Sequence, residues 1–150
     1  MLVVTAVLNS SPPLVLNTTA ISISGFNYGV GTGPSAAKSF TVSAQNLIDT
    51  LKISLTTSNF EISLSPNDGY VGNTNGPLKI VPVFGVVQPT LIYARLKAGL
   101  ASSTSSYLSK KVTISSTGAV SVVDTLNASI TWFLEYNEYT LGILLALRPC

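Results

Sequence analysis

The sequence contains no histidine, and its only cysteine is Cys150. Histidine is the commonest general base and the commonest metal ligand in proteins, so its absence removes many hydrolytic and metal-dependent mechanisms. A single thiol cannot form a disulfide within the chain or the cysteine cluster of a structural zinc site. Charged residues are also few, at 9% of the chain against about 25% in a typical domain. The sequence therefore predicts neither an enzyme nor a cofactor-dependent protein.

The sequence also lacks the features that indicate nucleic-acid binding, membrane insertion or a signal peptide. The eight basic and six acidic residues give a net charge of +2, and the basic residues are scattered apart from Lys110–Lys111, whereas nucleic-acid binding requires a clustered basic surface. The most apolar run, at 140–148, is far shorter than the ~20 residues that span a bilayer as a helix. The run at 1–13 lacks the positive start and long apolar core of a secretory signal. We expect no nucleic-acid binding, no membrane insertion and no signal peptide.

What the chain does contain is a repeated alternation of apolar and polar residues with a period of two. A period of two places successive side chains on opposite faces of a strand, so that one face is buried and the other is wet. Turn signals at 65–69, 73–76 and 116–118 separate such segments. The 150 residues therefore predict one all-β domain, a β-sandwich of about seven to nine antiparallel strands with extra terminal strands. The alternating segments lie at 21–24, 40–43, 51–55, 60–64, 92–97, 111–114 and 128–132.

The two ends of the chain differ from the middle in their pattern of apolar and polar residues. We expect residues 1–19 to form an N-terminal strand or arm, residues 20–131 to form the sandwich, and residues 132–150 to form an apolar strand extension. Both faces of a strand over 140–147 would carry apolar side chains, so a partner chain is needed to cover one face. The predicted interface with another protein subunit consists of Leu141, Ile143, Leu144, Leu145 and Leu147.

The glycine-rich stretch GVGTGPSAAKS at 29–39 resembles a phosphate-binding loop. That motif requires glycine immediately before its Lys-Ser pair and a helix after it. Here Ala37 precedes Lys38, and the residues that follow have the alternation of a strand. The pattern therefore indicates a surface turn that leads into a strand. An S-x-x-K match at 35–38 lacks its companion motifs and carries no argument for a serine enzyme.

Several other polar or aromatic residues are candidates for ligand contact. The stretch at 68–76 departs from the EF-hand pattern and has no closing glutamate, which leaves open only a calcium site of another kind at Asp68. Glu135 and Glu138 are the closest pair of carboxylates in the sequence, but one polar patch indicates a solvated turn more than a glycosidase site. Tyrosines can stack on sugars or pack in an interface. The candidate surface or glycan contacts are Tyr70, Tyr136 and Tyr139.

The middle of the chain resembles an immunoglobulin-like repeat found in secreted and surface proteins of Bacteroidetes-type bacteria. Four stretches carry the resemblance in the same order, and together they span about 110 residues. They are ISGFNYGVGTGPSAAKSFTVSAQNL at 23–47, NFEISLSPNDGY at 59–70, TLIYARLKAGLASSTSSYLSKKVTISSTGA at 90–119, and L-x-x-S-I-T at 126–131. The resemblance does not extend to residues 1–19 or 132–150.

The resemblance implies an immunoglobulin-like β-sandwich without catalytic residues, which serves in spacing, adhesion or contact with sugars and surfaces. Family modules normally follow a signal peptide, and none is expected here. We therefore expect a structural component of a virion exterior, such as a capsid decoration, head fibre or tail-associated protein, that forms homo-oligomers or binds capsid or tail subunits. The alternative is a secreted or cell-surface module for adhesion or carbohydrate binding, with host-surface glycans as ligands.

Overall fold

The computed structural model describes residues 11–20, 22–103 and 106–132, and within them it is almost entirely β-structure. This confirms the all-β class, with ten strands in the described residues; about seven to nine strands and extra terminal strands were expected. The elements are β1 (Val15–Thr18), β2 (Ser22–Gly29), β3 (Lys38–Gln45), β4 (Leu51–Leu55), β5 (Phe60–Ser63), β6 (Val71–Gly72), the 3₁₀ helix η1 (Asn73–Asn75), β7 (Leu78–Ile80), β8 (Val87–Leu96), β9 (Lys110–Ser115) and β10 (Val122–Thr131).

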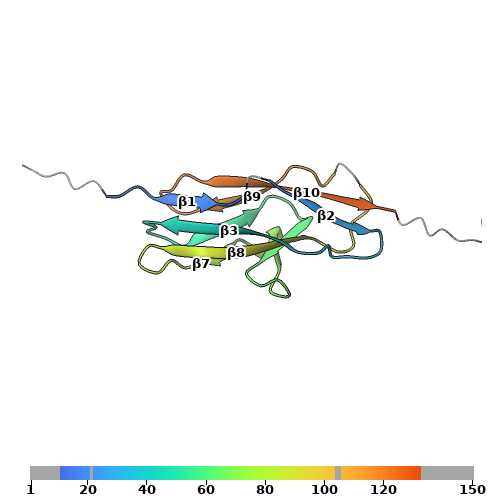
Figure 1. Cartoon of the computed structure of the whole chain (residues 1–150), viewed down its shortest axis with the longest axis horizontal. Helices are drawn as coiled ribbons and strands as arrows, with labels where there is room; N and C mark the ends of the chain where they lie inside the picture. Colours follow the sequence, from blue (N-terminus) through green and yellow to red (C-terminus); the bar gives the residue numbers. More distant parts are fainter. Residues whose placement is uncertain (1–10, 21, 104–105, 133–150) are drawn as a thin grey trace, which may run out of the picture.

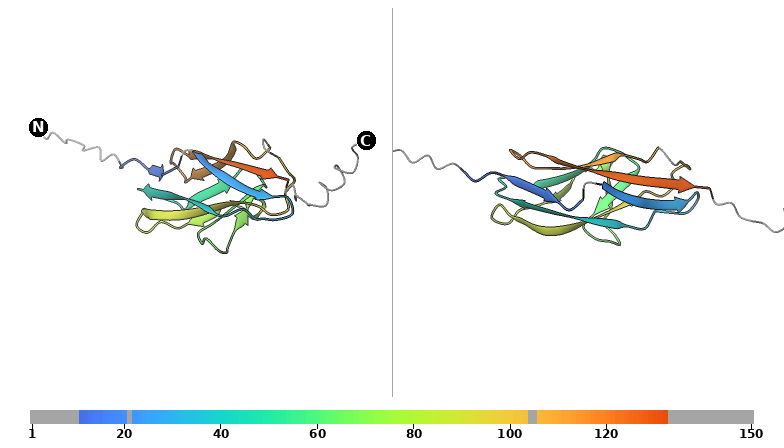
Figure 2. Two further views of the ribbon diagram at one scale, coloured as in Figure 1. Left: turned by 45° about the vertical axis from the view of Figure 1, so that its right-hand side comes forward. Right: turned by 45° about the horizontal axis from the view of Figure 1, so that its top comes forward.

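The strands form two sheets that pack face to face (Figures 1 and 2). The first sheet has the order β1-β3-β8-β5-β6 and the second has the order β2-β10-β9-β4-β7. The pairs are antiparallel as predicted, except that β2 runs parallel to β10. This exception arises because the chain crosses from the first sheet to the second between β1 and β2. β1 lies in the segment expected to be an N-terminal strand or arm, and its pairing with β3 makes Val15–Thr18 part of the sandwich.

The core lies between the sheets and follows the alternation in the sequence. In β3, for example, Phe40, Val42 and Ala44 are buried, and their neighbours face outward. At the centre, the rings of Phe26 and Phe60 meet edge to face with centroids 5.2 Å apart. Burial of each such side chain stabilises the fold by roughly 1.5–3 kcal/mol.

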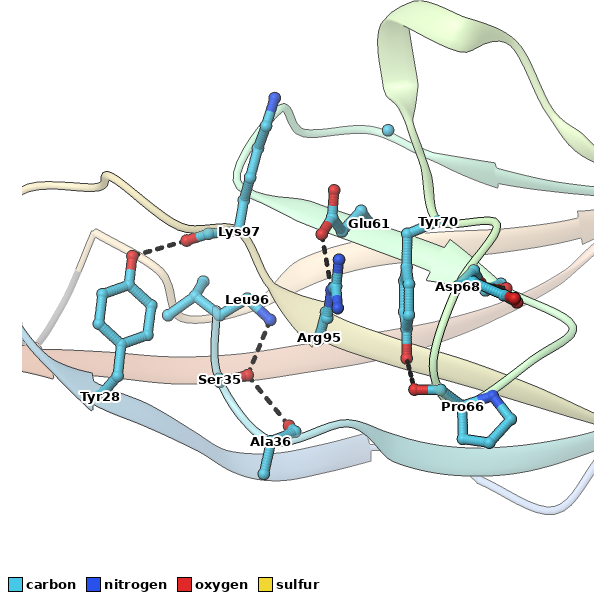
Figure 3. Close-up of polar contacts among 12 residues, drawn as sticks. Tyr28, Ser35, Ala36, Glu61, Pro66, Asp68, Tyr70, Arg95, Leu96 and Lys97 are labelled. Carbon is cyan, nitrogen blue, oxygen red and sulfur yellow. Dashed lines mark hydrogen bonds and ion pairs between the residues drawn. The ribbon is translucent and has the colours of Figure 1, made fainter. Parts of the chain in front are cut away.

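The glycine-rich stretch forms the predicted turn into a strand. Gly33 has a φ of +101°, and a Cβ at this position would lie 3.0 Å from the Tyr28 ring, so a larger residue would be both strained and crowded. Next to it, the Ser35 backbone N–H donates to the Leu96 carbonyl at 3.1 Å. The Leu96 N–H donates in turn to Ser35 Oγ at 2.9 Å (Figure 3). The turn is therefore fastened to the end of β8, and Lys38 begins β3 rather than a helix.

Strand register places three loops at one end of the sandwich: 46–50, 81–86 and 116–121. Ala44 at the end of β3 lies opposite Val87 at the start of β8, and Leu51 lies opposite Ile80. The described chain also enters at this end, where Asn46 donates a hydrogen bond to the Pro13 carbonyl. β10 runs to the opposite end, and the described chain leaves there (Figure 1). The sandwich therefore has an entry end and an exit end.

Candidate functional site

A two-residue hairpin turn joins β7 to β8 at the entry end. The Val83 N–H donates to the Val86 carbonyl at 2.9 Å, and the Val86 N–H donates to the Val83 carbonyl at 3.0 Å. The two central residues, Phe84 and Gly85, have φ values of +50° and +76°. Positive φ at both central positions is the requirement of a type I′ turn, for which Asn-Gly is the preferred sequence. Phenylalanine at the first position costs about 1–2 kcal/mol of backbone strain.

Burial does not offset this strain, because Phe84 is 101% exposed. The turn is nevertheless fixed by contacts with Leu47 in the neighbouring loop. The Leu47 N–H donates to the Gly85 carbonyl at 2.8 Å, and a Cβ on Gly85 would lie 3.0 Å from the Leu47 carbonyl oxygen. A strained residue that the surrounding structure holds in place is a reason to look for function at that position. Phe84 is such a residue, because its side chain is exposed to solvent and hydrogen bonds fix the turn that carries it.

Phe84 belongs to a cluster of exposed apolar side chains that we call the apolar tip. Its members are Ile48, Val81, Val83 and Phe84, which are between 68% and 101% exposed. Beside them lies an open groove of about 590 Å³ between the end of β7 and the start of β8, lined mainly by aliphatic side chains and by no charged residue. Single exposed apolar residues are common, whereas a contiguous group of them marks an interaction site.

The third loop of the entry end is tied to the apolar tip through Asp49. Thr117 Oγ1 donates to Asp49 Oδ2 at 2.6 Å, and Ser116 Oγ donates to the Asp49 carbonyl at 3.1 Å. The hydrogen bond from Thr117 is the main reason that the pKa of Asp49 lies below its ordinary value. The same loop carries Val120, which is 87% exposed. Exposed apolar side chains thus come from all three loops at this end.

Tyr70 lies elsewhere, in a cluster on the outer face of the first sheet (Figure 3). Arg95 Nε donates to Glu61 Oε1 at 2.7 Å, and the Arg95 guanidinium carbon lies 3.7 Å from the centre of the Tyr70 ring. The Tyr70 hydroxyl donates to the Pro66 carbonyl at 3.0 Å. Burial raises the pKa of Tyr70 above its ordinary value.

This arrangement limits what Tyr70 can bind, because Arg95 occupies one face of its ring. A sugar could stack only on the other face, and glycan contact at Tyr70 stays a prediction. The Asp68 carbonyl accepts a hydrogen bond from Ser63, and the described residues contain no group of three or more acidic, histidine or cysteine residues that could hold a metal ion. They also contain no helix long and apolar enough to cross a membrane.

Most of the other predicted site residues lie outside the described ranges. These are the interface residues Leu141, Ile143, Leu144, Leu145 and Leu147, the tyrosines Tyr136 and Tyr139, and also Glu135, Glu138 and Cys150. Conversely, sequence reasoning missed the apolar tip. Its signal was VPVFGV at 81–86, a two-residue Phe-Gly turn between apolar residues where Asn-Gly would be expected.

Comparisons with family models, with curated proteins and with solved structures found no match for this chain. The immunoglobulin-like resemblance therefore stays a prediction, although the two-sheet all-β architecture is established by the strand pairing. The apolar tip, with Phe84 at its centre, is the feature of the described residues that most directly indicates a function.

Proposed function

We propose that this protein is a non-catalytic structural module that self-associates through the apolar tip as part of a larger assembly. The observation that carries the proposal is Phe84, a fully exposed aromatic side chain held at a positive φ. Aromatic anchors supply much of the binding energy in protein interfaces. A rigid hairpin also presents such an anchor with little loss of conformational entropy on binding.

At such a site, the free energy gained by burying apolar side chains is comparable to the free energy lost when two molecules associate. Full burial of an apolar side chain contributes roughly 1.5–3 kcal/mol, so the four residues of the apolar tip together contribute roughly 6–12 kcal/mol. Association costs about 4–15 kcal/mol in lost translational and rotational freedom. The apolar tip can therefore offset most of this cost, and contacts around the groove would set the final affinity.

The proposed setting is the exterior of a virion, where such a module would decorate a capsid, a head fibre or a tail and contact other subunits. The alternative setting is the surface of a bacterial cell or the extracellular medium. A low charge content, the absence of histidine and a single cysteine support a structural role over a catalytic one in either setting. The resemblance to surface-protein repeats supports exposure on the outside of a particle or cell.

Sedimentation velocity of the full-length chain over a range of concentrations tests the proposal. Phe84→Asn removes the aromatic anchor, and we expect it to weaken self-association at least ~10-fold, which corresponds to about 1.4 kcal/mol. Leu91→Thr is the matched control, because Leu91 is a 48% exposed apolar residue on β8 that belongs neither to the apolar tip nor to the lining of the groove. It should leave self-association unchanged.

Two results would overturn the proposal. The first is a wild-type chain that stays monomeric up to the highest concentration at which it is soluble. The second is an equal loss of association in both variants, since that would show that any exposed apolar residue has the same effect.

A further inference from the structure

The groove of the apolar tip and the exit of the chain lie at opposite ends of the sandwich. The groove lies beside Ile80 and Val87, at the end of β7 and the start of β8. β10 ends at Thr131 on the other end, and 18 residues follow Trp132 in the sequence. Figure 2 shows the described chain entering at one end and leaving at the other.

Those last residues include a segment whose chemistry matches the groove. Residues 141–147 are LGILLAL, which contain no charge and carry leucine or isoleucine at alternate positions. In an extended conformation the segment would be ~23 Å long and would present apolar side chains on both faces. The groove is likewise free of charged lining residues. One face of the segment can therefore fill an uncharged groove without burying an unpaired charge.

The backbone beside the groove also suits an extended segment. β7 is the edge strand of the second sheet, paired on one side with β4 in the described part of the chain. An edge strand offers N–H and C=O groups to an additional strand, which is a common mode of peptide recognition. β7 has only three residues, and Ile80 at its end lines the groove.

The segment of the same molecule is poorly placed to reach this groove. β10 spans ten residues, or ~30 Å, and residue 141 lies nine residues after Trp132, which is also ~30 Å when fully extended. A reversal of direction uses several of those residues, so only the last part of the segment could return to the apolar tip. A segment from a second molecule has no such limit.

We infer that the groove of the apolar tip binds residues 141–147 of a second copy of this chain, so that copies join head to tail. This inference rests on the proposed function, to which it adds the part of the partner that fills the site. This contact joins two different surfaces of the molecule. Two copies that exchange their segments reciprocally form a closed dimer, whereas copies that do not exchange them form rings or filaments.

Cysteine cross-linking tests the inference, because Cys150 follows Leu147 by three residues, a distance of at most ~10 Å. The wild-type chain is mixed with a variant that carries Val81→Cys and Cys150→Ser. Val81 is 75% exposed, so the substitution should leave the fold intact. We expect mixed disulfide dimers to form at least ~10-fold faster than with the control variant Leu91→Cys, Cys150→Ser.

A third variant tests whether the segment that binds the groove comes from a second molecule or from the same molecule. With Val81→Cys and the native Cys150 in one chain, oxidation at micromolar concentration should give covalent dimers or a ladder of larger oligomers. A cross-linked monomer would show instead that the chain folds back on itself, and would overturn the inference.

The remaining outcomes distinguish this inference from the proposed function. Equal cross-linking rates at positions 81 and 91, or a predominance of disulfides between two copies of position 81, would overturn the inference. If Phe84→Asn nevertheless weakens self-association, the proposed function stands and the partner surface is another one. If the wild-type chain does not self-associate, both fail.

Discussion

Replacement of Phe84 with asparagine is expected to stabilise the isolated sandwich even though it removes the proposed binding anchor. Phe84 has a φ of +50° and is fully exposed, so no burial is lost with its ring. Asparagine adopts this backbone conformation with less strain than phenylalanine, and Asn-Gly is the preferred sequence of the turn. Stability and association should therefore change in opposite directions.

The size of the gain follows from the cost of the left-handed conformation. That cost is about 1–2 kcal/mol for an ordinary residue, and we expect asparagine to recover ~1 kcal/mol of it. In a domain of this size, ~1 kcal/mol raises Tm by roughly 2–4 °C. Self-association stabilises the native state by mass action, so the comparison must be made where all variants are monomeric.

Urea unfolding and calorimetry at a concentration shown to be monomeric by sedimentation measure the gain. Phe84→Ala is the control, since it removes the ring without supplying a residue suited to positive φ. It should weaken association as Phe84→Asn does, but without the gain in stability. The reasoning is refuted if Phe84→Asn is no more stable than Phe84→Ala, because the strain at this turn would then be absent.

Three further predictions concern other parts of the fold, and urea unfolding checks each of them. Burial raises the pKa of Asp124 above its ordinary value of 3.8, so the folded state holds this proton more tightly than the unfolded state does. The stability of wild type relative to Asp124→Asn should therefore fall as pH rises from below 3.8 through the raised pKa. A stability difference that does not change with pH would contradict this. Gly33→Ala should cost ~1 kcal/mol more than Gly31→Ala, since both have positive φ but only Gly33 faces the Tyr28 ring; equal costs would exclude that contact. Tyr70→Phe should cost ~1 kcal/mol through the lost hydrogen bond to the Pro66 carbonyl, and a changed sedimentation profile would show that the outer-face cluster takes part in self-association.

The sequence was sufficient to predict the sandwich because burial on one face leaves a period of two. β3 and β4 show this directly, since their inward residues are the apolar ones and their outward residues are polar. This period does not determine the order of the strands within each sheet. The parallel pair of β2 and β10 joins segments about 100 residues apart and depends on where the chain changes sheet. The sheet change between β1 and β2 left no periodic signal, so residues 1–19 were assigned to a strand or arm outside the sandwich.

The candidate site was harder to predict, for a related reason. VPVFGV at 81–86 has the composition of a buried strand, and only the backbone shows that it turns outward. Tyr70 was singled out as a surface aromatic residue, but its contact with Arg95 comes from a strand 25 residues away. In both cases the surroundings of an apolar or aromatic residue are set by non-local pairing, which composition and spacing do not record.

The exposure of Phe84 is best understood as a property of the isolated molecule that association removes. A flexible loop with an exposed phenylalanine would relax and bury the ring against its neighbours. The 81–86 hairpin cannot do so without breaking the two hydrogen bonds between Val83 and Val86 and the one from Leu47 to Gly85. Each such bond contributes about 0.5–1.5 kcal/mol, so the three together contribute about 1.5–4.5 kcal/mol. This total is comparable to the roughly 1.5–3 kcal/mol available from burying the ring. The ring therefore stays outside in the monomer, and a second molecule can bury it while these three hydrogen bonds stay intact.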